Sequence, residues 1–294
     1  MLPHKLVRAV RRRLARRERK GRERFFANAE EQTPYLAVEA RGAVYLVSTS
    51  DQNIGRGLFV KRKRKEFTRL ARAVAAIDAV GGRTTEGSTL IDVGANIGTT
   101  VVPAVLEHGF AHGVALEPVP ETFDLLTLNV RANGLEGAIV TVQAAASDHD
   151  GSAIIEIDPA NSGTAAIVDG AESRHWMEIE TMTLDHLVED GVIDPGSTGL
   201  IWMDVEGHEP RVLAGARSLL ERGVPVIAEF GSGGGGPAED PRELCDALAP
   251  YYTHFVDLGV DWQDMPPLRA IDTLSELGEE GRCFTDILAV RVAR

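Results

Sequence analysis

The sequence has only two cysteines, Cys245 and Cys283, and neither lies at the spacing of zinc ligands from histidines or another cysteine. A disulfide framework and a zinc site are therefore disfavoured. The sequence also lacks an apolar run near the roughly 20 residues that span a bilayer. Its arginine-rich start is not followed by the apolar segment of a signal peptide. These absences indicate a cytoplasmic location.

Two common nucleotide-binding motifs are missing as well. No Gly-Lys-Ser or Gly-Lys-Thr follows a glycine-rich loop, which excludes a P-loop. The glycine-rich loop that is present, residues 94–98, has Asn96 where a dinucleotide-binding fingerprint has its middle glycine. That glycine lets the backbone approach a pyrophosphate. Binding of a dinucleotide is therefore not expected.

Charge is distributed unevenly along the chain. The formal net charge is −13, yet residues 1–24 contain eleven Lys and Arg against two Glu, so the remaining residues carry a net −22. An acidic body argues against a stable nucleic-acid partner. Residues 1–34 are interpreted as a basic, flexible tail. A weak contact of residues 1–24 with an anionic membrane or another polyanion is the alternative.

The most informative stretch is T-L-I-D-V-G-A-N-I-G at residues 89–98. Its apolar residues predict a short buried strand, Gly94 and Gly98 permit a sharp turn, and a helix is expected over 97–108. Such a loop would point backbone N–H groups at a ligand above it. Glu117 ends the next predicted strand, where a carboxylate can accept the two hydroxyls of a ribose.

The loop and Glu117 together indicate a cofactor that contains adenosine. Asp92, which opens the loop, suits a cationic amino group better than phosphates, which it would repel. S-adenosylmethionine carries an ammonium, a carboxylate, a ribose and an adenine, so it matches both parts of this predicted site. The alternative is an ordinary turn between a strand and a helix that binds no ligand.

Beyond residue 88, predicted strands and helices alternate, which is typical of a doubly wound, mostly parallel α/β sheet. The last two predicted strands, 252–258 and 286–292, have no clear helix between them and indicate one antiparallel strand. Residues 35–47 predict a β-hairpin. The predicted organisation is a tail (1–34), an N-terminal cap of hairpin and helix (35–87), and a main domain (88–294).

A second group of polar residues follows the predicted central strand at 198–205. Asp204 ends this strand, and Glu206 and His208 follow at alternate positions before a predicted helix over 208–221. An alcohol acceptor has a very high pKa, so a nearby base that accepts its proton would speed methyl transfer. Asp204 and Glu206 are therefore candidates for positioning or deprotonating the acceptor. His208 is a candidate base, with a surface position as the alternative, and no metal site is predicted.

Two further segments follow predicted strands. Ser147 and Asp148 are placed to hydrogen-bond the edge of an adenine, and the small Ala145 and Ala146 leave room for its ring. A turn cap is the alternative for this pair. The glycine-rich segment 231–236 is interpreted as a linker loop, with a lid hinge as the alternative.

Taken together, these segments resemble the FkbM family of class I S-adenosylmethionine-dependent methyltransferases. The resemblance covers about residues 88–230. It lies in IDVGANIG (91–98), LEPVPETFDLLTLNVRANGL (116–135), AAASDHDG (144–151), TLDHL (183–187) and WMDVEGHEPRVLAGA (202–216). It implies a seven-stranded Rossmann-like sheet and O-methylation of hydroxyls on small molecules, sugars or secondary metabolites. The resemblance also places the Asp204-Val205-Glu206-Gly207 motif beside the transferred methyl group.

The leading hypothesis is thus an S-adenosylmethionine-dependent O-methyltransferase acting on a small molecule or glycan. Alternatives are methylation of a macromolecule, RNA or protein, and a non-catalytic nucleotide-binding module. The candidate catalytic residues are Asp204, Glu206 and His208, and the candidate cofactor-binding residues are Asp92, Gly94, Ala95, Asn96, Gly98, Glu117, Pro118, Ser147 and Asp148.

Overall fold

A mixed β-sheet forms the framework of the protein. The computed structural model describes residues 4–81, 83–158, 160–168, 175–231, 241–263, 265–279 and 284–292. The strands of this sheet are β3(Thr89–Val93), β4(His112–Leu116), β5(Ile139–Val142), β10(Thr198–Met203), β11(Val226–Gly231), β12(His254–Asp257), β13(Leu268–Ala270) and β14(Phe284–Val290). Their spatial order is β13-β12-β14-β11-β10-β3-β4-β5.

Strand direction confirms the predicted doubly wound sheet. Strands β5, β4, β3, β10 and β11 pair in parallel, and β14 pairs antiparallel with both β11 and β12. Strand β13 adds a short eighth strand, antiparallel to β12, at the edge. The sequence did not indicate this strand because three residues carry too little alternation to detect.

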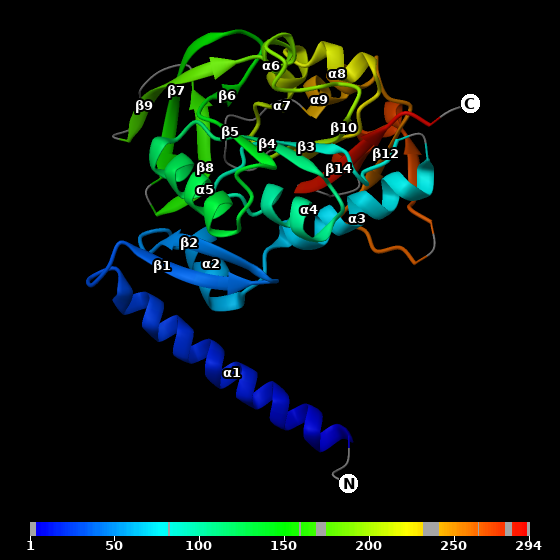
Figure 1. The fold of residues 1–294 in the computed structure, drawn as a ribbon. Helices are drawn as coiled ribbons and strands as arrows, with labels where there is room; N and C mark the ends of the chain where they lie inside the picture. The colour runs from blue at the N-terminus through cyan, green and yellow to red at the C-terminus, as the bar shows by residue number, and fades with distance from the viewer. Residues whose placement is uncertain are drawn as a thin grey trace.

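Helices cover both faces of the sheet (Figure 1). One face is covered by α3(Lys65–Val80), α4(Val101–Glu107) and α5(Pro120–Ala132), and the other by α6(Leu184–Glu189), α7(Glu209–Ala214), α8(Arg217–Glu221) and α9(Pro241–Leu248). Successive residues of β3 therefore enter different cores: Leu90 packs with the first set of helices and Ile91 with the second. This burial on both faces explains why the central strands are almost continuously apolar.

The predicted helix over 208–221 is wrong in one respect, because the structure divides it into α7 and α8. Gly215 lies between the two helices, and a side chain there would meet the backbone carbonyl of Ser147. Between β13 and β14 the described residues form two short helices, η1(Ile271–Thr273) and α10(Glu276–Glu279). Of the glycine-rich segment, only Gly231 is described, and Cys283 also lies outside the described residues.

A second, four-stranded sheet lies beside the main one (Figure 1). It contains β6(Ala145–Ala146), β7(Gly151–Asp158), β8(Asn161–Val168) and β9(Trp176–Met182), in the order β6-β9-β7-β8. Ile155 and Ile179 form a small core with Val119, which follows β4. The second sheet is therefore packed against the chain at the carboxyl end of β4.

The N-terminal part comprises α1(His4–Ala29), β1(Tyr35–Ala40), β2(Ala43–Ser48) and α2(Ile54–Lys61). The predicted hairpin is present, with β1 antiparallel to β2. Residues 4–29 form a helix, consistent with the high helix propensity of their many Arg, Ala and Leu residues, and the flexibility of this segment stays a prediction.

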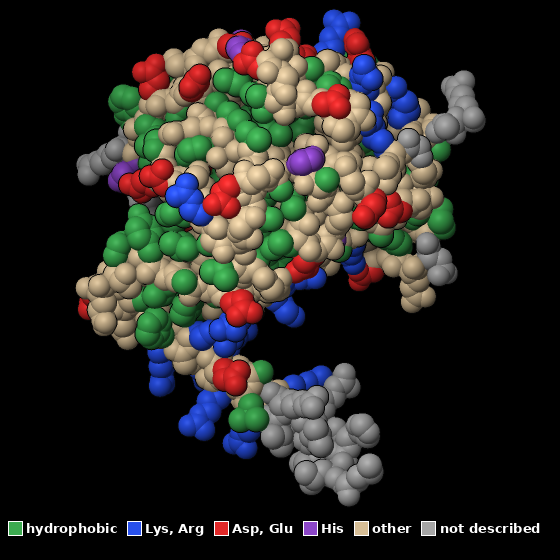
Figure 2. All heavy atoms as spheres, in the orientation of Figure 1, with side chains coloured by type: hydrophobic (Ala, Val, Ile, Leu, Met, Phe, Trp, Pro, Cys, Tyr) green, Lys and Arg blue, Asp and Glu red, His purple; other side chains and the backbone are tan. Residues whose placement is uncertain are grey.

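Helix α1 projects away from the body, and its described Lys and Arg side chains are visible along it (Figures 1 and 2). Its end is held on α2, where Phe25 stacks on Phe59 and Arg22 Nε donates to the carbonyl of Val60 at 3.0 Å. The contact with an anionic surface stays a prediction. No described helix is long and apolar enough to cross a membrane.

Asn129 of α5 and Asn133, the residue that follows this helix, attach the hairpin to the main domain. Asn129, which is 0% exposed, accepts from the N–H of Leu46 (2.6 Å) and donates to the carbonyls of Leu46 (3.2 Å) and Ile97 (2.9 Å). One turn later, Asn133 accepts from the N–H of Val44 (2.9 Å) and donates to its carbonyl (2.8 Å). These side chains satisfy the free edge of β2 as a neighbouring strand would.

We expect Asn129→Leu to lower the free energy of unfolding by about 2–4 kcal/mol, because it leaves buried donors and acceptors of two segments unpaired. Asn133→Leu, one turn along and only partly buried, should cost less than about 1.5 kcal/mol. Urea unfolding followed by circular dichroism measures both values. Equal losses for the two variants would contradict the structural role assigned to Asn129.

Candidate functional site

A pocket of about 820 Å³, part of it open to solvent, lies at the carboxyl ends of β3, β4 and β10. Eight of the predicted site residues line it: Gly94, Ala95, Asn96, Glu117, Pro118, Asp204, Glu206 and His208. Four do not: Asp92, Gly98, Ser147 and Asp148. The predicted loop and the predicted acidic motif after β10 therefore share one pocket.

Two residues of the loop after β3, a glycine and an asparagine, adopt backbone conformations with positive φ that most other residue types disfavour. Gly94 has a φ of 77°, and a side chain there would meet the carbonyl of Asp204. Asn96 has a φ of 49°, a left-handed conformation that asparagine tolerates better than most residues. Asparagine can therefore stand where a dinucleotide-binding loop has glycine.

The loop does not offer N–H groups from residues 94–98 to a ligand, so that expectation is wrong. Each of these five groups donates to another part of the chain. The bonds run from Gly94 to Leu116 O (3.1 Å), Ala95 to Leu116 O (2.9 Å), Asn96 to Glu117 Oε2 (3.0 Å), Ile97 to Asn96 Oδ1 (2.9 Å) and Gly98 to Ala95 O (2.8 Å). The loop is instead tied to the end of β4.

Glu117 connects the loop to the next strand. Its carboxylate accepts from the N–H groups of Asn96 (3.0 Å) and Val119 (2.9 Å). Burial raises the pKa of Glu117 to about 7, and the two backbone hydrogen bonds act against this rise. Each carboxylate oxygen can accept more than one hydrogen bond. Glu117 can therefore hold the loop and still accept ribose hydroxyls.

Asp92 lies beneath the loop rather than in the pocket. It is 1% exposed, and its Oδ2 accepts from the N–H of Val101 at 3.0 Å, at the start of α4. Burial raises the pKa of Asp92 to about 8, and the nearby Asp204 and Glu117 carboxylates add to the rise. The predicted contact with a cationic amino group does not fit this position, because the side chain faces the helix start.

Asp204 and Glu206 enter the pocket from the end of β10. The N–H of Asp204 donates to the carbonyl of Val93 at 3.1 Å, which fixes this segment against the loop. Glu206 has a φ of 52°, a costly conformation for a side chain of this type that often marks functional sites. Burial raises the pKa of Asp204 to about 6 and that of Glu206 to about 7. Both values suit a general base near neutral pH.

Ser147 and Asp148 support His208 instead of lining the pocket, so the structure does not place them at a ligand. Ser147 Oγ lies 3.0 Å from His208 Nε2 and donates to Asp148 Oδ1 at 3.2 Å. Arg211 Nη1 donates to Asp148 Oδ2 at 2.8 Å. Burial lowers the pKa of His208, and the positive charge of Arg211 adds a smaller lowering effect. The alanines beside Ser147, residues 144–146, do line the pocket, as predicted.

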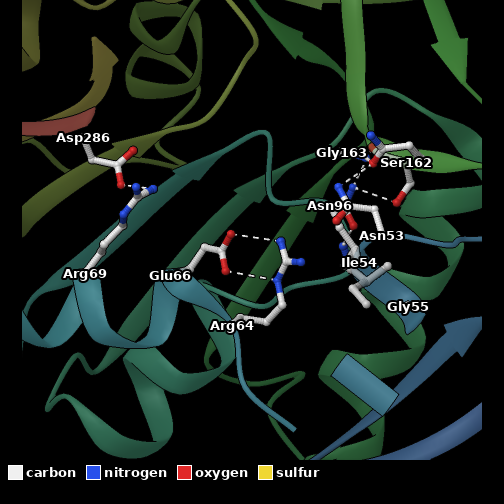
Figure 3. Close-up of polar contacts among 12 residues, drawn as sticks. Asn53, Ile54, Gly55, Arg64, Glu66, Arg69, Asn96, Ser162, Gly163 and Asp286 are labelled. Carbon is white, nitrogen blue, oxygen red and sulfur yellow. Dashed lines mark hydrogen bonds and ion pairs between the residues drawn. The ribbon is translucent and has the colours of Figure 1, made fainter. Parts of the chain in front are cut away.

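The N-terminal cap supplies two charged pocket residues that the sequence analysis missed. Arg64 belongs to the basic run of residues 61–65, and it lines the pocket. Its Nε and Nη2 donate to Glu66 Oε2 (3.0 Å) and Oε1 (2.9 Å), as Figure 3 shows. Glu66 shares a helical face with the buried Leu70 and Ile77. This spacing could have indicated from the sequence that Glu66 faces the protein rather than the solvent.

The cap and the second sheet meet across the loop (Figure 3). Asn96 Nδ2 donates to the carbonyl of Ser162 at 2.9 Å, and Ser162 Oγ donates to Asp51 Oδ2 at 2.7 Å. Asn53 Nδ2 donates to Asn161 Oδ1 at 2.8 Å. Because Ser162 also lines the pocket, these bonds join the three segments that enclose it.

We expect the free energy of unfolding to rise as pH falls from 8 to 5.5. Asp92, with a folded pKa of about 8, binds a proton in this range that the unfolded chain, with a pKa near 3.9, does not bind. One such proton contributes about 1.4 kcal/mol per pH unit. Asp92→Asn should keep the bond to Val101 and reduce this slope by about one proton. Denaturant unfolding at several pH values measures it, and an unchanged slope would contradict the assignment.

Comparison with solved structures finds similar chains among methyltransferases. Methyltransferase FkbM from Methylobacillus flagellatus is 19% identical, with a TM-score of 0.37, and the match covers 51% of this chain and 34% of that one. TYW2 of M. jannaschii, solved with AdoMet, is 10% identical, with a TM-score of 0.45 over 89% of this chain and 88% of that one.

A curated relative and a family model give closer matches. Hexuronic acid methyltransferase AglP from Haloferax volcanii is 33% identical over 165 residues, which is 56% of this chain and 62% of the relative. The chain thus spans less than two thirds of that relative's length. The model of the methyltransferase FkbM domain matches residues 92–253, more than half of the chain. The resemblance in the sequence motifs is therefore confirmed, and the chain belongs to the FkbM methyltransferase family.

Proposed function

We propose that this protein is an S-adenosylmethionine-dependent methyltransferase that methylates a hydroxyl group of a sugar or another small molecule. The observation that carries the proposal is one shared pocket. It combines Glu117, suited to a ribose, with Asp204 and Glu206, suited to an acceptor. Membership of the FkbM family supports the same reaction class.

The described residues of the pocket fit this cofactor in the chemistry of their side chains. The lining includes Pro118 and the alanines at 144–146, which are apolar side chains suited to contact with an adenine ring. The lining also includes four carboxylates, which favour a ligand with a positive charge: Glu66, Glu117, Asp204 and Glu206.

When bound, S-adenosylmethionine supplies a methyl group on an electrophilic sulfonium. The chain's part is to orient the acceptor and remove its proton. Glu206, held towards the pocket by its left-handed backbone, is the proposed base, and Asp204 beside it is proposed to hydrogen-bond the acceptor hydroxyl. His208 is a second candidate base, held by Ser147. Water exclusion by the cap and the second sheet would favour the transfer.

The acceptor class follows from the curated relative. That relative is named for a hexuronic acid, so we propose a sugar acceptor, with a hexuronic acid as the first to be tested. The acidic lining favours neutral hydroxyls near Glu206 over phosphorylated groups. Methylation of RNA, the macromolecular alternative, finds no support in the acidic body of the chain.

We expect Glu117→Ala to weaken S-adenosylhomocysteine binding about 10- to 100-fold, because it removes a charged acceptor for the ribose hydroxyls. Glu121→Ala, an exposed change in the first turn of α5, is the matched control and should have no effect. Isothermal titration calorimetry measures both. Absence of binding to the unmodified protein would overturn the proposed function.

We expect Glu206→Gln to lower kcat about 10²- to 10⁴-fold with little change in cofactor affinity, the range for loss of a general base. Transfer of labelled methyl groups to nitrophenyl glycosides of glucuronic acid, galacturonic acid and glucose measures the rate. For the unmodified protein, kcat should rise between pH 5.5 and 8, because the ionised carboxylate is the active form and its pKa is about 7.

The exposed Glu189→Gln in α6 is the control for this series. A fully active Glu206→Gln variant, or a rate independent of pH across this range, would contradict the role of Glu206 as base.

A further inference from the structure

The geometry points to Arg64, held by Glu66, as the residue that binds the carboxylate of the cofactor's methionine part. This inference rests on the proposed function and adds to it a binding residue from the N-terminal cap. It concerns the end of the pocket near Asp204 and Glu206, away from the ribose position at Glu117.

The lining of the pocket is mainly acidic, so a carboxylate of the ligand needs a positively charged partner there. The described lining contains four carboxylates and a single guanidinium, that of Arg64. His208 is the other basic residue of the lining, and burial lowers the pKa of its imidazole, which disfavours a positive charge there. S-adenosylmethionine brings its own carboxylate into this acidic pocket. Without a cation nearby, that group would be repelled by its surroundings.

The loop cannot meet the need with backbone N–H groups. All five from residue 94 to residue 98 are already hydrogen-bonded within the chain. Thr99 and Thr100 also line the pocket and can add neutral hydroxyl donors. Neither carries a charge. Arg64 is therefore the described lining group that can both donate hydrogen bonds and balance the charge of a carboxylate.

Arg64 is oriented for this task. Its side chain is 14% exposed and is fixed by two hydrogen bonds to Glu66, whose own side chain is 4% exposed. These bonds use Nε and one hydrogen of Nη2. Both hydrogens of Nη1 and the second hydrogen of Nη2 remain, which is the edge that can bind a carboxylate through two parallel bonds.

The position of Arg64 agrees with the methionine end of the pocket. The positive charges of Lys65 and Arg64 lower the pKa of Asp204 against the larger effect of burial, so both charges lie within electrostatic reach of that residue. Figure 3 shows the pair at the start of α3, on the side of the loop where α3 approaches the sheet. The cap thus supplies one end of the cofactor site and the main domain supplies the other.

An acceptor carboxylate, such as that of a hexuronic acid, would be attracted by the same guanidinium. The two sources are separated by comparing S-adenosylmethionine with decarboxylated S-adenosylmethionine, which differ only in the carboxylate. Calorimetric titrations without acceptor measure both affinities on the full chain. Since a misfolded variant would lose both ligands, the ratio of the two affinities isolates the carboxylate contact.

We expect Arg64→Met to weaken S-adenosylmethionine binding about 10- to 100-fold and to change decarboxylated S-adenosylmethionine binding less than about twofold. Arg64→Lys should recover part of the loss, because it keeps the charge but not the two-bond geometry. Glu66→Gln should also weaken binding of S-adenosylmethionine relative to decarboxylated S-adenosylmethionine, but by a smaller factor than Arg64→Met. Lys63→Met, an exposed change in the same basic run that does not line the pocket, is the control and should alter neither affinity.

The inference is overturned if Arg64→Met changes both ligands equally or neither. It is also overturned if cofactor affinity is unchanged while the KM for glucuronides alone rises, since the acceptor would then be the carboxylate that Arg64 binds. Failure of the unmodified protein to bind either ligand is a different result, because it would reject the proposed function itself.

Discussion

Several buried carboxyl groups at one end of the sheet are the constraint on which the site depends. Asp92, Glu117, Asp204 and Glu206 all have pKa values raised by burial. Keeping several ionised carboxylates together in a region of low polarity is unfavourable unless a cation lies among them. A ligand with a sulfonium and an ammonium meets this requirement, whereas a nucleoside phosphate would make it worse. The electrostatics of the pocket thus select the class of ligand that the fold accommodates.

Hydrogen bonding keeps this arrangement rigid. The carbonyl of Leu116 and the carboxylate of Glu117 accept three successive N–H groups of the loop, so β3 and β4 are joined where they leave the sheet. On the other side of β3, the N–H of Asp204 donates to Val93. Three neighbouring strand ends therefore hold one another in place, and the pocket between them is preorganised.

The N-terminal cap contributes residues to the pocket. Asn129 anchors the hairpin through buried hydrogen bonds, and Ser162 connects the cap to the loop through Asp51 and Asn96. Arg64 then enters the pocket from the start of α3. A residue outside the matched family region, residues 92–253, thereby becomes part of the site.

Much of the fold was predictable from local pattern, and so was the meeting of the loop after β3 with the acids after β4 and β10 at one pocket. The period of the apolar residues indicates the alternating strands and helices. The glycines of the loop and the acids at the strand ends are recognised from their positions next to those strands. Eight of the twelve candidate residues line the pocket. Asp92, Gly98, Ser147 and Asp148 lie outside the lining. For the polar residues the reason is that a side chain at a strand end can face either a ligand or the protein. Only the packing around it decides which.

The amino-acid sequence by itself determined the parallel sheet, the tight loop and the carboxylate of Glu117, because backbone sterics and hydrophobic burial act over a few residues. Only the tertiary structure decided that the loop's N–H groups turn to β4, that Asp92 supports a helix and that Arg64 faces the pocket. The physical reason is that the hydrogen-bond partners and neighbouring charges of these groups come from segments distant in sequence. These segments become neighbours only when the chain is folded.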